Sequence, residues 1–177
     1  MAIALTKRQI KEMGIEYVIG AAHWPMYVPM ESEAVMRDFH RQNMFLATHP
    51  LVTIVGHPWW WHGHWRDADG GYHTDPWLDD FRRVPASMHE ELAAAAIEHG
   101  KVVEINLEAM LLNAGYLESF KRQYLEFAAW LKGRGVRLCL GSDCHDENYA
   151  IGFDRGARML ESVGIGEEDL WVLPARR

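Results

Sequence analysis

The chain has few cysteines, no excess of positive charge and no long apolar run, and each shortage excludes a class of protein. Cys139 and Cys144 are its only two cysteines, too few for a disulfide framework and typical of a reducing compartment. The formal net charge is −7, which does not suit a surface that neutralises nucleic-acid phosphates. Lys7 and Arg8 interrupt the apolar N-terminal stretch, and no segment approaches the roughly 18 apolar residues of a membrane span. We therefore expect a cytoplasmic protein that binds neither nucleic acid nor membrane.

What the chain does have is enough apolar material for one core. Its 177 residues are 49% hydrophobic, and neither a fixed-period repeat nor a low-complexity linker divides them, so residues 1–177 are predicted to form a single domain. Ten histidines and eight tryptophans are many for this length. By composition alone, they could still be a few core aromatics and surface histidines.

Apolar runs alternate with helical patterns along the chain. Helical spacing of apolar residues predicts helices over 5–13, 31–47, 86–99, 117–132 and 153–163. Gly14, Gly100, Gly133 and Gly164 are expected to end helices, and Ser87 with Glu90 to form a capping box. Compact apolar runs predict strands over 16–22, 51–55, 101–106 and 136–140, and residues 59–77 have no periodicity and predict a long loop. The alternation predicts an α/β fold with about four parallel strands joined by helical crossovers.

Each predicted strand carries or runs into a side chain that can bind a metal or move a proton. His23 and His57 follow the first two strands, Glu104 lies in the third, and Asp143 and His145 follow the fourth. Because the carboxyl ends of parallel strands share one edge, these side chains are expected to converge. Imidazoles with a carboxylate suit Zn²⁺, Mn²⁺ or Fe²⁺.

A purely structural role of each residue has to be weighed against metal binding. A single histidine after a strand, such as His23, is more often structural than a ligand. Pro58 follows His57, and a proline is a common way to end a strand, so this pair is weak evidence for a ligand as well. The pair Asp143 and His145 carries more weight, because alternate residues of an extended segment project the same way. Recurrence at every strand favours a metal site.

Four segments resemble motifs of the PHP (polymerase and histidinol phosphatase) family: IGAAHW, VGHPWWW, VVEINLEAM and LGSDCHDENYAIGFDRGARMLESVGI. The likeness extends from about Ile15 to Val172. It implies a partial or distorted (β/α) barrel of the PHP type, a centre of up to three divalent metal ions, and hydrolysis of phosphomonoesters such as histidinol phosphate.

Carried over to this chain, the resemblance implies that His23, His57, Asp143 and His145 are metal ligands. Glu104 is expected to support the ligands from behind rather than to bind metal. Cys144 stands where the family has small residues and is not expected to be a ligand.

The chain departs from the family at its start. The family barrel begins with an H-x-H strand, followed by further His and Glu ligands, whereas no histidine precedes His23 here. The chain therefore resembles the C-terminal portion of the barrel, as a fragment, as a chain completed by another, or as a reduced form. His62 and His64 form an H-x-H inside the predicted loop and could replace the missing ligands. The alternative is that the neighbouring tryptophans pack the loop down and these histidines face solvent.

The sequence thus predicts a metal-dependent phosphoesterase acting on a small phosphorylated substrate, with one to three metal ions and with Asp143 orienting or deprotonating the attacking water. Two alternatives stay open: a non-catalytic, degenerate subunit with a partial metal site, and a carbon–nitrogen hydrolase of the amidohydrolase type. Arg66 and Arg155 are candidate phosphate contacts, although a surface role suits each better. We also expect a homo-oligomer, a two-fold dimer whose interface covers the edge near residues 15–22, or a second chain that completes the barrel.

Overall fold

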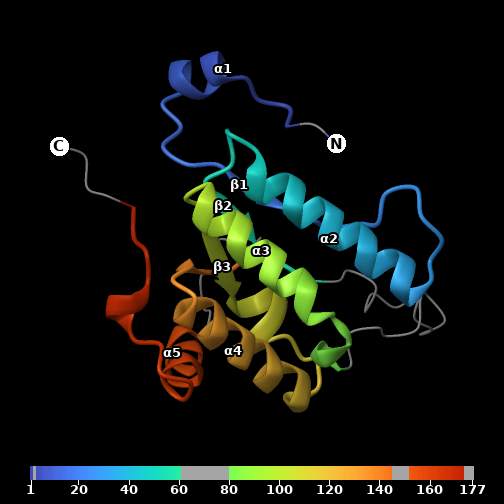
Figure 1. The fold of residues 1–177 in the computed structure, drawn as a ribbon. Helices are drawn as coiled ribbons and strands as arrows, with labels where there is room; N and C mark the ends of the chain where they lie inside the picture. Colours follow the sequence, from blue (N-terminus) through green and yellow to red (C-terminus); the bar gives the residue numbers. More distant parts are fainter. Residues whose placement is uncertain (2, 61–79, 145–151, 174–177) are drawn as a thin grey trace.

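A parallel sheet of four strands lies at the centre of the molecule, in a computed structural model that describes residues 1, 3–60, 80–144 and 152–173 (Figure 1). The strands are β1 (Ile19–Ala21), β2 (Ile54–Gly56), β3 (Val102–Asn106) and β4 (Arg137–Gly141), in the order β1-β2-β3-β4. Every neighbouring pair is parallel. The predicted α/β class with four parallel strands and helical crossovers is therefore confirmed.

Helices connect the strands and cover one face of the sheet. The elements are α1 (Lys7–Glu12), α2 (Ser32–Thr48), the 3₁₀ turn η2 (Phe81–Arg83), α3 (Ala86–Glu98), the π-helical turn η3 (Leu107–Leu111), α4 (Glu118–Gly133), α5 (Phe153–Glu161) and the 3₁₀ turn η4 (Glu167–Asp169). Figure 1 shows α2, α3 and α4 side by side over the sheet, with α1 standing apart. Among the residues described, no helix is long and apolar enough to cross a membrane.

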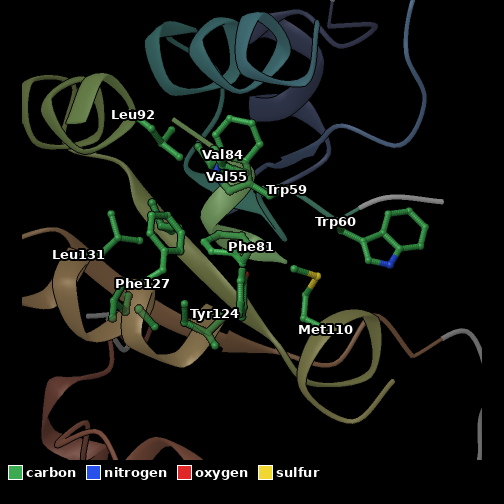
Figure 2. Packing of buried hydrophobic residues seen from close by; sticks show 14 of the residues in the cluster. Val55, Trp59, Trp60, Phe81, Val84, Leu92, Met110, Tyr124, Phe127 and Leu131 are labelled. Carbon is green, nitrogen blue, oxygen red and sulfur yellow. The ribbon is translucent and has the colours of Figure 1, made fainter. Parts of the chain in front are cut away.

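The main core lies between the sheet and these helices. Val55, Val103 and Ile105 point to this side and are completely buried. Aromatic rings fill the space beside them, where Phe81 lies 5.3 Å from Phe127 between ring centroids (Figure 2). Burial of this apolar area is the main force that holds the helices on the sheet.

The start of α3 differs from the expected capping box. The helix begins at Ala86, with Pro85 as its N-cap and no side-chain cap hydrogen bond. The backbone N–H of Met88 already donates to the Pro85 carbonyl at 2.9 Å, so Ser87 lies inside the first turn, where it does not act as an N-cap. Glu90 pairs instead with Arg134, the residue that follows α4. A capping box does form at α1, where Thr6 and Gln9 bond each other's backbone.

Several predicted boundaries shift by a few residues. Gly14, Gly100 and Gly164 follow their helices with φ of 65°, 62° and 76°, as expected of helix-ending glycines. Gly133 is instead the last residue of α4, and Gly135 (φ 85°) takes the left-handed conformation. β1 and β2 have only three residues each, fewer than the apolar runs suggested.

The segment after α5 lies along the outer edge of β4. Leu170 forms an isolated parallel bridge with Leu138, whose carbonyl accepts a hydrogen bond from the Trp171 N–H at 2.6 Å. An ion pair of 2.5 Å between Lys132 and Asp169 fastens the preceding turn to α4. The sequence pattern did not predict this contact, which brings Trp171 over the second face of the sheet.

Candidate active site

The face of the sheet opposite α2, α3 and α4 borders a cavity of about 860 Å³. Ile54, Glu104, Cys139 and Gly141 point into it, on the side of the strands opposite Val55 and Val103. Residues that follow the strands form its rim. The lining residues that carry polar side chains or a thiol are Tyr17, His23, His57, Glu104, Cys139, Ser142, Asp143, Cys144 and Trp171.

Strained backbone marks two of the rim residues. His57 has a backbone φ of 25° and Asp143 one of 54°. Residues other than glycine rarely adopt such positive φ angles. Such conformations cost about 1–3 kcal/mol each and persist only where surrounding contacts enforce them. At His57 one such contact is a hydrogen bond: the backbone N–H of His57 donates to Glu104 Oε2 at 2.8 Å.

Glu104 is a buried carboxylate held between two glycines of the neighbouring strands. A Cβ built on Gly141 would lie 1.8 Å from Glu104 Oε1, and one on Gly56 would lie 3.5 Å from Oε2. Only glycine at position 141 therefore allows the carboxylate this place. Burial raises the pKa of Glu104, while the hydrogen bond from His57 lowers it. Glu104 thus contacts the end of β2 through the His57 N–H, and its expected supporting role stays a prediction.

His57 and His23 lie together at the rim. Their ring centroids are 5.0 Å apart with an interplanar angle of 81°, and Trp60 lies 5.0 Å from the His57 ring. Burial and the charge of His23 lower the pKa of His57 to about 4, against the opposing effect of the Asp143 carboxylate. The His57 imidazole is therefore neutral at pH 7. Its Nδ1 is buried and has no hydrogen-bond partner among the described residues.

Three of the four residues predicted to bind metal line this one cavity: His23, His57 and Asp143. The fourth, His145, lies outside the described residues, as do His62 and His64. Within the described ranges, no three His, Cys, Asp or Glu side chains gather closely enough to hold a metal ion. The described residues thus complete no metal site by themselves, and the ligand assignments stay predictions.

The remaining candidates are placed less centrally. Cys139 is buried, and burial raises the pKa of its thiol to about 12, so the thiol stays protonated at neutral pH. Cys144 lines the cavity and its N–H donates to Ser142 Oγ at 3.2 Å. Arg155 is exposed and does not line the cavity, and Arg66 lies outside the described residues.

Two features of the site escaped the sequence interpretation. Trp171 forms a wall of the cavity, although nothing in its local sequence points there. Gly141 makes room for Glu104, which belongs to another strand and does not lie near it in the sequence.

No protein-family model matches the chain, but curated and solved proteins are similar to it. A probable phosphatase of Acetivibrio thermocellus is 38% identical over 76 residues, which is 43% of this chain and 30% of that protein. A probable phosphatase of Caldanaerobacter subterraneus subsp. tengcongensis is 28% identical over 173 residues, 94% of this chain and 54% of that protein. The chain therefore spans about half the length, or less, of these relatives.

Among solved structures, the fold is similar to a histidinol phosphate phosphatase of Lactococcus lactis subsp. lactis, crystallised with zinc, L-histidinol and phosphate. The TM-score is 0.60 and the sequence identity 15%, over 91% of this chain and 64% of that one. The structural likeness shows the fold, and the two probable phosphatases add sequence similarity to it. Together these comparisons relate the chain to probable phosphatases by sequence and to a histidinol phosphate phosphatase by fold.

Proposed function

We propose that the chain forms the active-site portion of a metal-dependent phosphoesterase that acts on a small phosphomonoester. The observation that carries the proposal is that His23, His57 and Asp143 line one cavity, where the neutral imidazole of His57 lies beside His23. A neutral imidazole is the form that binds metals. The similarity to probable phosphatases favours phosphate esters over other substrates.

The described residues divide into holding, orienting and positioning roles. His23 and His57 would hold a Zn²⁺, Mn²⁺ or Fe²⁺ ion, which when bound supplies Lewis acidity toward phosphoryl oxygens. Asp143 lines the same cavity and would orient or deprotonate the attacking water. Glu104 keeps His57 in its strained conformation through the His57 N–H. By the resemblance alone, His145 would be a further ligand, with His62 and His64 as additional ones for up to three ions.

One observation favours a second candidate, a subunit with a partial site and no turnover. The described part of the chain brings no three metal-binding side chains close together. Elemental analysis of protein purified without chelators separates the two candidates. The phosphoesterase predicts near-stoichiometric metal and turnover of phenyl phosphate, and the partial-site subunit predicts neither.

Asp143→Ala tests the mechanism directly. We expect roughly a 100-fold or larger loss of turnover, because the group that orients the water is removed while the strand remains packed. Asp154→Ala, at an exposed carboxylate in the first turn of α5, is the matched control and should keep full activity. Equal activity in both variants would exclude Asp143 from the mechanism.

The expected oligomer remains a proposal as well. β1 is an edge strand of the sheet, and Ile19 on it is 51% exposed. An exposed apolar edge strand favours pairing with another chain. We propose a two-fold dimer through this edge, with a second chain completing the barrel as the alternative. Light scattering at micromolar concentration would show a dimer, and a stable monomer would contradict the proposal.

A further inference from the structure

The Glu104 carboxylate lies near the end of β3 rather than beside its own Cα. Glu104 and Asn106 leave β3 on the same face of the sheet, opposite Val103 and Ile105, which belong to the main core. Gly141 is the register partner of Asn106, yet a Cβ built on Gly141 would overlap Glu104 Oε1. The carboxylate therefore leans along the strand to the level of Asn106.

Asn106 is completely buried, and one end of its side-chain amide is fixed. Its Oδ1 accepts the backbone N–H of Ala109 at 2.9 Å, which makes Asn106 the N-cap of the π-helical turn η3. Because the oxygen faces Ala109, the other end of the amide is the Nδ2 donor. Nδ2 is buried and has no hydrogen-bond partner among the described residues. Burying a donor without a partner is costly, so an acceptor is expected close by.

Glu104 supplies an acceptor at this level of the sheet. One donor, the His57 N–H, bonds its buried carboxylate at 2.8 Å. A carboxylate accepts several hydrogen bonds and is costly to bury with few of them. Burial raises the pKa of Glu104, whereas the His57 N–H and the Asn106 side chain lower it. The Asn106 amide therefore acts on the carboxylate, although its Nδ2 completes no hydrogen bond within the described part of the chain.

We infer that Asn106 is a positioning residue of the site: its Nδ2 is a second donor to Glu104 and orients the carboxylate that holds the His57 N–H. Asn106 does not line the cavity, so it acts through Glu104. Asparagine is required because its oxygen caps η3 while its nitrogen faces Glu104. An aspartate could still form the cap, but it would place a second carboxylate beside the first. The inference rests on the proposed function only in treating His57 as a functional residue.

The test follows the exchange of the His57 backbone amide proton, measured by NMR in the metal-free full chain. Asn106→Asp keeps the cap of η3 and removes the donor to Glu104, so this exchange should become at least about tenfold faster. Asn113→Asp is the matched control, because Asn113 Oδ1 also accepts a backbone N–H, that of Gly115 at 2.8 Å. The control should change the His57 exchange rate less than about twofold.

A double variant separates the orientation of the carboxylate from a general loss of packing. Glu104→Gln combined with Asn106→Asp exchanges donor and acceptor: the new amide donates to the new carboxylate, and its oxygen accepts the His57 N–H. Exchange at His57 should return to within about threefold of the wild-type rate. If Asn106→Asp does not fold, a folded double variant supports the inference, and failure of both variants to fold overturns it.

Zn²⁺ titration measures the consequence for the site. Asn106→Asp should weaken Zn²⁺ binding by about 10–100-fold, the range seen when a residue that orients a metal ligand is changed. If the wild type binds no Zn²⁺, the proposed function fails, and exchange at His57 still decides the inference. An unchanged exchange rate in Asn106→Asp, an equal acceleration in Asn113→Asp, or no recovery in the double variant would overturn it.

Discussion

The two faces of the sheet are built on different principles. On the helix-covered face, Val55, Val103 and Ile105 are completely buried within the main hydrophobic cluster. On the cavity face, Glu104 is buried between glycines, and the rim residue His57 has a strained backbone and an imidazole nitrogen that has no partner in the described structure. One face stabilises the fold, and the other uses part of that stability to hold polar groups in place.

Two histidines show why a low pKa by itself does not identify a functional residue. Burial lowers the pKa of both His57 and His89 to about 4. His89 lies among aromatic rings, 5.2 Å from Phe81 and 4.5 Å from Phe127 between centroids. His57 instead lies at the rim of the cavity that Asp143 also lines, and its backbone N–H donates to the Glu104 carboxylate. The neighbours, and not the titration, separate a candidate ligand from a histidine packed among aromatic rings.

The largest expected difference between the faces is in the free energy of unfolding. Ile105→Ala on the helix-covered face should lose about 2–5 kcal/mol, because it removes buried methyl groups and leaves a cavity. Ile19→Ala on the cavity face should lose less than about 1 kcal/mol, because Ile19 is half exposed. Urea denaturation of both variants measures the difference. Equal losses would mean that the cavity face is covered as completely as the other.

A methyl group added to a glycine of the cavity face should also be costly. Gly141→Ala places a Cβ against the buried Glu104 carboxylate, and we expect a loss of about 1–3 kcal/mol together with reduced turnover. Gly133→Ala, at the end of α4 with no atom within 4 Å of the added Cβ, is the control. It should be neutral or stabilising by up to about 1 kcal/mol, because alanine favours the helix. Denaturation and turnover of the two variants are compared side by side.

The smallest expected effect is the pH dependence of the free energy of unfolding that His89 causes on the helix-covered side of the sheet. The folded pKa of His89, about 4, lies below its ordinary value of 6.5, so below pH 6.5 the unfolded chain binds a proton that the folded chain does not. Stability is therefore lost as the pH falls from 6.5 toward 4. His89→Phe removes this loss. The difference in unfolding free energy between the variant and the wild type should therefore change in favour of the variant by on the order of 1–2 kcal/mol as the pH falls from about 7.5 to about 4.5. A difference that stays constant with pH would contradict the neutral state of the His89 imidazole in the folded protein.

Some of the fold was predictable because its causes are local. Helical spacing of apolar residues in α2 and α4, and compact apolar runs in β3 and β4, depend on residues within a turn or two of each other. The wrong capping box at Ser87 shows the limit of such patterns. Whether Ser87 caps a helix depends on where the first turn starts, and the N-cap is Pro85, two residues before Ser87.

The sequence by itself determined the α/β class, the parallel order of the strands and the placing of His23, His57 and Asp143 at strand ends, since alternation along a chain leaves few ways to pack it. Only the tertiary structure decided which groups meet. Glu104 reaches the His57 N–H across 47 residues, and Trp171 reaches the sheet through Leu138. Contacts between residues so far apart depend on sheet register and on the path of the chain, and no local pattern records either.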